Sequence, residues 1–135
     1  MKVDNIFKLD IPLFVSHVYF AITPTIDDFK KAKIGKEYGE GFKLSEAELI
    51  TKYQNYNGEC FFNGGIIVIA LYDLNDKYST IPHESSHAAR HILDNIRVKE
   101  LDDEVFAYLV GYISEFCFEK LEKYKNLNNS VKDKK

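Results

Sequence analysis

Residues 83 to 94 read HESSHAARHILD and place His83 and His87 four positions apart, with Glu84 directly after the first histidine. On an α-helix, residues four apart differ by about 40° around the axis and by about one turn along it, so the two imidazoles project side by side. Glu84 is rotated by about 100° from His83. Two imidazoles in this arrangement can occupy two corners of a zinc tetrahedron, with the carboxylate pointing past the metal toward a water. The stretch therefore predicts a zinc-binding, water-activating helix.

The residues before the motif predict where its helix begins. Thr80 is a suitable N-cap, and Pro82 would then lie in the first turn, where its missing N–H costs nothing. Apolar residues recur at helical spacing to about Asn95. A last long helix is predicted over about 103–125, capped by Asp102 or Asp103. Because its first half, VFAYLVGYI, is apolar almost all round, we expect it to be central and buried.

Two regions carry the composition of β-strands. IPLFVSHVYFAIT, residues 11 to 23, is rich in β-branched and aromatic residues and is ended by Pro24. GECFFNGGIIVIALYD, residues 58 to 73, predicts a β-hairpin, because Asn-Gly-Gly separates two apolar runs and tolerates the positive φ angles of a tight turn. The second run, residues 66 to 72, is apolar at every position. It indicates a strand covered on both faces or one whose open edge serves another purpose.

Two short helices are predicted between these strand regions. TIDDFKKAKIGKEYG, from Thr25, is loosely amphipathic with early acids and late lysines, and Gly39 and Gly41 break it. Ser45 and Glu48 form a capping box for a second helix through SEAELITKY.

The chain has 135 residues, a formal net charge of -3, 45% hydrophobic and 29% charged residues. These values predict one globular domain, over residues 1–125, followed by a polar, frayed tail over 126–135. The slight acidity disfavours a nucleic-acid partner. The apolar run near the N-terminus lacks the build of a signal peptide and is too short to cross a bilayer, so no membrane partner is expected. Cys60 and Cys117 resemble small buried hydrophobes, which favours a reducing, cytoplasmic location.

A catalytic zinc needs a third protein ligand and an open position for water. The pattern HExxHxxGxxH would supply a third histidine, but Arg90 and Leu93 stand where its glycine and last histidine would be. His91 is one turn beyond His87, too far along a straight helix to reach the same ion. The remaining candidates are carboxylates on the next element: Asp102, Asp103 and Glu104.

HESSHAARHI followed by DDEVFAYLVGY resembles the core of the gluzincin-type zinc metallopeptidases, over roughly residues 58 to 118. The small size and the upstream hairpin are similar to minimal zincin-like domains, including those encoded by phages and mobile elements. The resemblance implies a single-domain α+β zincin-like fold, with a small antiparallel or mixed sheet packed on the motif helix and a buried C-terminal helix. It implies zinc bound by His83, His87 and Glu104, with Glu84 as general base.

Two further expectations follow from this resemblance. Zincin sheets end in an edge strand that pairs with extended substrate, and residues 66–72 are the candidate. Larger members use a Tyr or His to steady the oxyanion, and this sequence has no clear match; Tyr108, His17 and His91 are weak candidates. Asp103 is the alternative to Glu104 as third ligand.

The sequence therefore predicts a zinc-dependent peptidase that acts on a peptide or protein through a zinc-activated water. The alternative is an inactive zincin-like module, encoded by a phage or mobile element, that binds a host protein in the host cytoplasm. The intact Glu84 favours the enzyme, because an inactive module has no need of a general base. The missing oxyanion group favours the module. A purely structural zinc is disfavoured, because such sites usually close with a fourth Cys or His.

Overall fold

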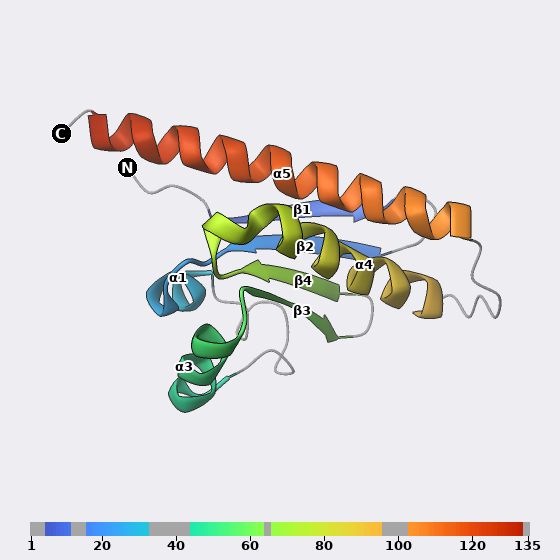
Figure 1. Ribbon diagram of the computed structural model, residues 1–135, viewed down its shortest axis with the longest axis horizontal. Helices are drawn as coiled ribbons and strands as arrows, with labels where there is room; N and C mark the ends of the chain where they lie inside the picture. Colours follow the sequence, from blue (N-terminus) through green and yellow to red (C-terminus); the bar gives the residue numbers. More distant parts are fainter. Residues whose placement is uncertain (1–4, 12–15, 33–43, 64–65, 96–102, 134–135) are drawn as a thin grey trace.

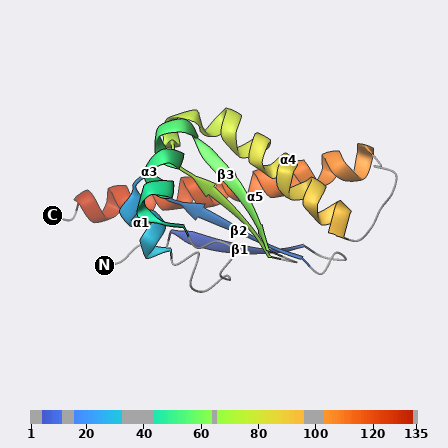
Figure 2. The same cartoon turned by 90° about the horizontal axis from the view of Figure 1, so that it is seen from below.

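The computed structural model describes residues 5–11, 16–32, 44–63, 66–95 and 103–133. In chain order these ranges form β1 (Ile6–Ile11), β2 (Ser16–Ile22), α1 (Ile26–Lys31), α3 (Glu46–Asn55), β3 (Gly58–Asn63), β4 (Ile66–Leu71), the short 3-10 helix η2 (Leu74–Asp76), α4 (Lys77–Asn95) and α5 (Asp103–Asp133). Helices α4 and α5 lie on the same side of the sheet (Figure 1 and Figure 2). Helices α1 and α3 gather at the end of the sheet where β2 and β4 finish.

The four strands form a mixed sheet in the order β1-β2-β4-β3. β1 runs antiparallel to β2, with Phe7 opposite Phe20, and β3 runs antiparallel to β4, with Cys60 opposite Ile69. β2 and β4 are parallel, so Phe20 is also opposite Ile69. Parallel neighbours need a long crossover connection, and here that connection carries α1, α3 and β3. The predicted α+β class, the mixed sheet and the hairpin of β3 with β4 are confirmed.

Strand β4 is buried on both faces because its side chains alternate between two hydrophobic clusters. Ile67, Ile69 and Leu71 join the core under α4 and α5. Val68 and Ala70 pack with residues of α1 and α3 on the opposite face. This placement confirms the interpretation of the apolar run as a strand covered on both sides.

The prediction that residues 66–72 form the substrate-pairing edge is wrong, because β4 lies between β2 and β3. β3 is the edge strand on this side, and among the described strands it pairs only with β4. The error arose because an apolar run indicates burial but does not say which strand lies beside it.

Helices α4 and α5 pack against each other in antiparallel directions. Near the start of α4 the Tyr78 ring stacks on Phe118 with centroids 5.6 Å apart, and further along α4 the Arg90 guanidinium lies 5.4 Å from the Phe106 ring centroid. The prediction that the last helix is central and buried is wrong, because α5 covers one face of the sheet and buries only one row of residues. This apolar row has helical spacing and faces the core: Leu109, Ile113, Cys117, Leu121 and Tyr124. None of the described helices combines the length and apolar character needed to cross a membrane.

Several predicted boundaries need correction. The run over residues 11–23 is not one strand, since Ile11 ends β1 and β2 begins at Ser16. α5 continues to Asp133, past the predicted end at 125, so residues 126–133 of the predicted tail are helical. The glycines expected to end the first short helix lie outside the described residues, as do the hairpin turn at 64–65 and Asp102.

The start of α4 also differs from the prediction. Thr80 is not its N-cap, because α4 begins at Lys77, directly after η2. The Asp73 carboxylate accepts a hydrogen bond from the Asn75 backbone N–H at 2.9 Å and so starts the helical path earlier. Pro82 consequently lies in the second turn rather than the first. The Ser45–Glu48 capping box of α3 is confirmed.

Candidate metal centre

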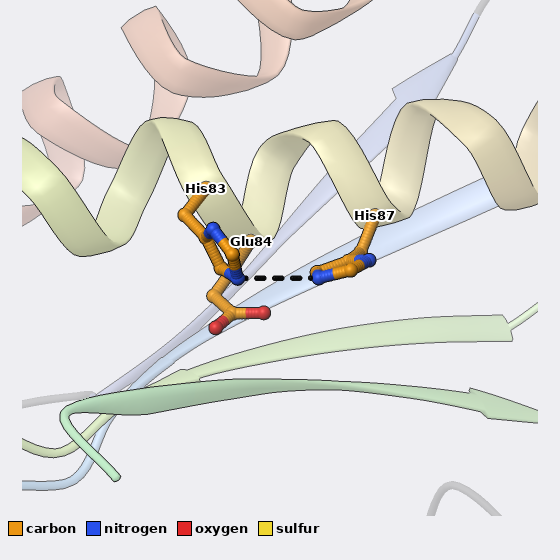
Figure 3. Close-up of side chains that lie close together, drawn as sticks. All are labelled: His83, Glu84 and His87. Carbon is orange, nitrogen blue, oxygen red and sulfur yellow. Dashed lines mark hydrogen bonds between the residues drawn. The ribbon is translucent and has the colours of Figure 1, made fainter.

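The side chains of His83, Glu84 and His87 gather on the flank of α4 that faces the edge of the sheet. In Figure 3 all three point from α4 toward the strands β3 and β4. Their potential ligand atoms all lie within 4.8 Å of one another. The two imidazole rings meet edge to face, with centroids 4.8 Å apart. The predicted convergence of the HExxH side chains is therefore present in the structure.

The separation of the two histidine nitrogens matches the edge of a zinc tetrahedron. Two nitrogen ligands at about 2.0–2.1 Å from zinc, separated by a tetrahedral angle, lie about 3.3 Å apart. The Nε2 atoms of His83 and His87 are 3.2 Å apart. At this distance one neutral imidazole can also donate its N–H to the other, so the pair is held in place without a metal. The donor set and its spacing fit zinc.

Burial distinguishes Glu84 from the two histidines. The His83 and His87 side chains are exposed, whereas Glu84 is only 7% exposed. Burial raises the pKa of Glu84, the two nearby histidines partly offset this rise, and Glu59 adds to it. A raised pKa makes the ionised carboxylate a better proton acceptor near neutral pH. The arrangement thus combines two accessible nitrogen ligands with one sheltered base.

A glycine lets α4 approach the sheet closely enough to form this site. A Cβ on Gly58 would lie 2.5 Å from Thr80 Cγ2 and 2.9 Å from the Ala70 carbonyl oxygen. Asp76 also joins the two elements, since its Oδ2 accepts a hydrogen bond from Asn57 Nδ2 at 2.6 Å and from the Thr80 hydroxyl at 3.4 Å. The start of β3 and the start of α4 are therefore held together immediately before the motif.

A cleft with a volume of about 230 Å³ opens beside the motif. His83 and Glu84 form part of its wall, and the rest comes from the end of α3, the start of β3, the connection between them, η2 and the first turns of α4. Its lining residues are Asn55, Tyr56, Asn57, Gly58, Asp76, Ser79, Thr80, His83 and Glu84. None of the first seven was predicted to be a site residue. The sequence shows a polar segment before the hairpin, but it does not indicate that this segment packs against α4.

The structure does not bring Glu104 to the two histidines. Glu104 and Asp103 are exposed in the first turn of α5, and neither belongs to the group of converging ligand atoms. Because Phe106 lies beside Arg90 and the helices are antiparallel, the first turn of α5 lies toward the C-terminal end of α4. Asp102 lies outside the described residues.

The three weak candidates for an oxyanion-stabilising group all lie elsewhere. Tyr108 is 69% exposed on α5 and stacks on Tyr112. His17 lies on β2, where its Nδ1 atom is 2.6 Å from Asp10 Oδ1. His91 lies on α4 and stacks on the Phe62 ring of β3, with ring centroids 4.1 Å apart. None of the three lines the cleft.

Both cysteines are free, and neither joins the converging group. Cys60 is partly buried and Cys117 fully buried, as the apolar surroundings predicted. Burial raises the pKa of both thiols, so the neutral form is favoured. Neither belongs to the group formed by His83, Glu84 and His87. Among the described residues, neither cysteine therefore supplies the fourth ligand that a structural zinc site would have.

The chain matches no protein-family model, no curated protein and no solved structure. The resemblance to gluzincins therefore rests on the motif residues themselves.

Proposed function

We propose that this protein is a zinc-dependent peptidase in which His83 and His87 bind the metal and Glu84 is the general base. The observation that carries this proposal is the 3.2 Å separation of the two exposed Nε2 atoms, with the buried Glu84 carboxylate beside them. Two neutral imidazoles and one sheltered carboxylate are the protein groups that zinc-assisted hydrolysis requires on a single helix.

Each of these residues has a distinct task. Zinc, when bound, supplies the Lewis acidity that makes water a competent nucleophile at neutral pH. Glu84 accepts the proton that the attacking water loses and then donates it to the leaving amine. Its burial keeps the carboxylate poorly solvated, which strengthens its interaction with that proton. His83 and His87 would hold the metal through their imidazole nitrogens.

The edge strand supports a peptide as the substrate. β3 runs beside α4 and, among the described strands, pairs only with β4. A strand with one unpaired edge can bind an extended peptide through main-chain hydrogen bonds. A peptide added along β3 would pass beneath the flank of α4 that carries the motif. β3 thus replaces β4 as the proposed substrate strand.

One observation favours the alternative, a zincin-like module that binds a host protein without cleaving it. Within the described parts of the chain, the converging group contains no acid, histidine or cysteine beyond the three motif residues. If Glu84 itself were the third ligand, no base would remain and turnover would be lost. The role of Glu84 therefore decides between the two functions.

The experiment is a comparison of wild type with Glu84→Gln. If Glu84 is the base, zinc content stays unchanged, and cleavage of a peptide library falls by at least about 10²-fold. Glu119→Gln, the same change at an exposed position of α5, is the control and should alter neither quantity. Loss of zinc in Glu84→Gln would make Glu84 a ligand. Chelator-insensitive cleavage, or no cleavage by the zinc-loaded wild type, would contradict the peptidase.

A further inference from the structure

We propose that the cleft beside His83 and Glu84 accepts a cationic side chain, lysine or arginine, of the peptide substrate. This inference rests on the proposed function, because it assigns a specificity pocket to that same site. The cleft shares two wall residues with the motif, so a side chain that enters it places its own backbone next to the histidine pair.

The size of the cleft suits one side chain rather than a whole small molecule. Its volume of about 230 Å³ lies below the roughly 300–1,000 Å³ of pockets that enclose drug-sized ligands. It is also open on one side of the motif helix, between α4 and the α3–β3 connection. These dimensions favour a long, unbranched side chain reaching in from a peptide on the surface.

Asp76 gives the cleft a negative charge. Both side-chain hydrogen bonds that Asp76 accepts from described residues end on Oδ2, which leaves Oδ1 available to a ligand. No described lysine or arginine forms an ion pair with it, and none lines the cleft. The neighbouring Lys77 ammonium instead lies 5.1 Å from the Tyr78 ring centroid. A cationic ligand therefore meets an uncompensated carboxylate.

Tyr56 provides the aromatic part of the pocket. Its side chain is 54% exposed, although it lines the cleft. The Lys52 ammonium lies 5.9 Å from the Tyr56 ring centroid, so this ring already interacts with one cation of the protein, and its exposed part is left for the aliphatic stem of a ligand. The charge of Lys52 is matched by Glu59, whose Oε2 is 2.6 Å from Nζ, so the wall does not repel a second cation. Tyr56 and Asp76 together fit an aliphatic stem that ends in a positive charge.

A binding measurement tests the pocket without depending on catalysis. Nα-acetyl-lysine amide and its uncharged analogue Nα-acetyl-norleucine amide are titrated into ¹⁵N-labelled, zinc-loaded protein. The lysine amide should shift the amide signals of Asn57, Gly58 and Ser79, and the norleucine amide should bind at least about tenfold more weakly. Asp76→Asn keeps the shape and the acceptor oxygen but removes the charge, so it should abolish this preference. Asp94→Asn, at an exposed position of α4, should keep it.

Ser79→Lys provides a second variant in case Asp76→Asn fails to fold. Ser79 is exposed at the cleft, so its replacement places a positive charge there without disturbing the Asp76 hydrogen bonds. The added ammonium would compensate the Asp76 carboxylate, so the preference for lysine or arginine peptides over norleucine peptides should be lost. If wild type binds both amides equally, or cleaves peptides without preference for basic residues, the proposed cation pocket is wrong. Neither result would contradict the peptidase proposal. Selective binding without any cleavage would support the pocket and contradict the peptidase.

Discussion

Helices α4 and α5 cover the same face of the sheet, but they use polar residues in different ways. α5 turns an apolar row toward the core, and its acids at Asp103 and Glu104 are exposed. α4 instead buries Thr80, Glu84 and Ser85 among its apolar contacts. Both helices lie over an edge of the described sheet, because α5 contacts β1 and β2 and α4 contacts β3 and β4. The difference therefore comes from the residues that each helix places there.

A helix over a sheet edge has one flank against the core and one flank beside solvent. His83 and His87 occupy the solvent side of that boundary, and Glu84 lies just inside it. A metal site needs this combination, because its ligands must be reachable while its base is sheltered. α5 also contacts an edge strand, β1, but among the described residues its acids do not converge with histidines, and Asp103 and Glu104 are exposed in its first turn.

The largest expected effect separates the motif histidines from a third histidine on the same helix. His83→Ala or His87→Ala should lower zinc affinity by more than about a hundredfold, since loss of an outer-shell partner alone costs about 10–100-fold. His91→Ala is the matched control and should stay within about twofold, because His91 stacks on Phe62 instead. Calorimetric titration and metal content provide the values. Equal losses at all three histidines would contradict the two-nitrogen site.

A smaller effect is expected from two glycine substitutions that compare the packing of α4 and α5. Gly58→Ala should lower the free energy of unfolding by about 1–3 kcal/mol, because its Cβ overlaps Thr80 and the Ala70 carbonyl. Gly111→Ala on α5 meets open space and should raise it by about 0.5–1 kcal/mol through helix propensity. Urea denaturation measures both. A neutral Gly58→Ala would mean that α4 does not pack tightly on β3.

The smallest effect concerns Glu104. Because the first turn of α5 lies toward the far end of α4, Glu104→Ala should change zinc affinity by less than about twofold. Asp103→Ala serves as the comparison at the same helix start, and calorimetry again measures affinity. A loss of tenfold or more in Glu104→Ala alone would restore it as third ligand and would require α5 to approach the motif.

The sequence predicted the site geometry well where the geometry is local. The convergence of His83, Glu84 and His87 depends only on helical spacing, and the Ser45–Glu48 cap depends on four consecutive residues. The antiparallel pairing of β3 with β4 was predictable for the same reason, since only two residues separate the two strands in the sequence. None of these features depends on residues that are distant in the sequence.

The remaining features depend on long-range packing. The position of Glu104 relative to the histidines depends on how two helices are aligned, and the sequence spacing between them does not determine that alignment. The parallel pairing of β2 with β4 joins segments on either side of a long crossover. The cleft likewise has Tyr56 and Asp76 in one wall because the missing side chain of Gly58 lets α4 pack close to β3. Early entry into α4 through η2 was missed because the Asp73 turn resembles an ordinary loop.

The central place of β4 also governs how the chain folds. Residues 66–72 are apolar and without charge or proline, which is the composition of segments that self-associate as stacked strands. β2, which pairs with β4, is separated from it by the crossover, and α4 and α5, which cover one of its faces, are synthesised after it. Pairing over such sequence distances is slow compared with helix formation. Until α4 and α5 have docked, β4 is therefore an apolar strand-forming segment that is open to pairing with a second incomplete chain.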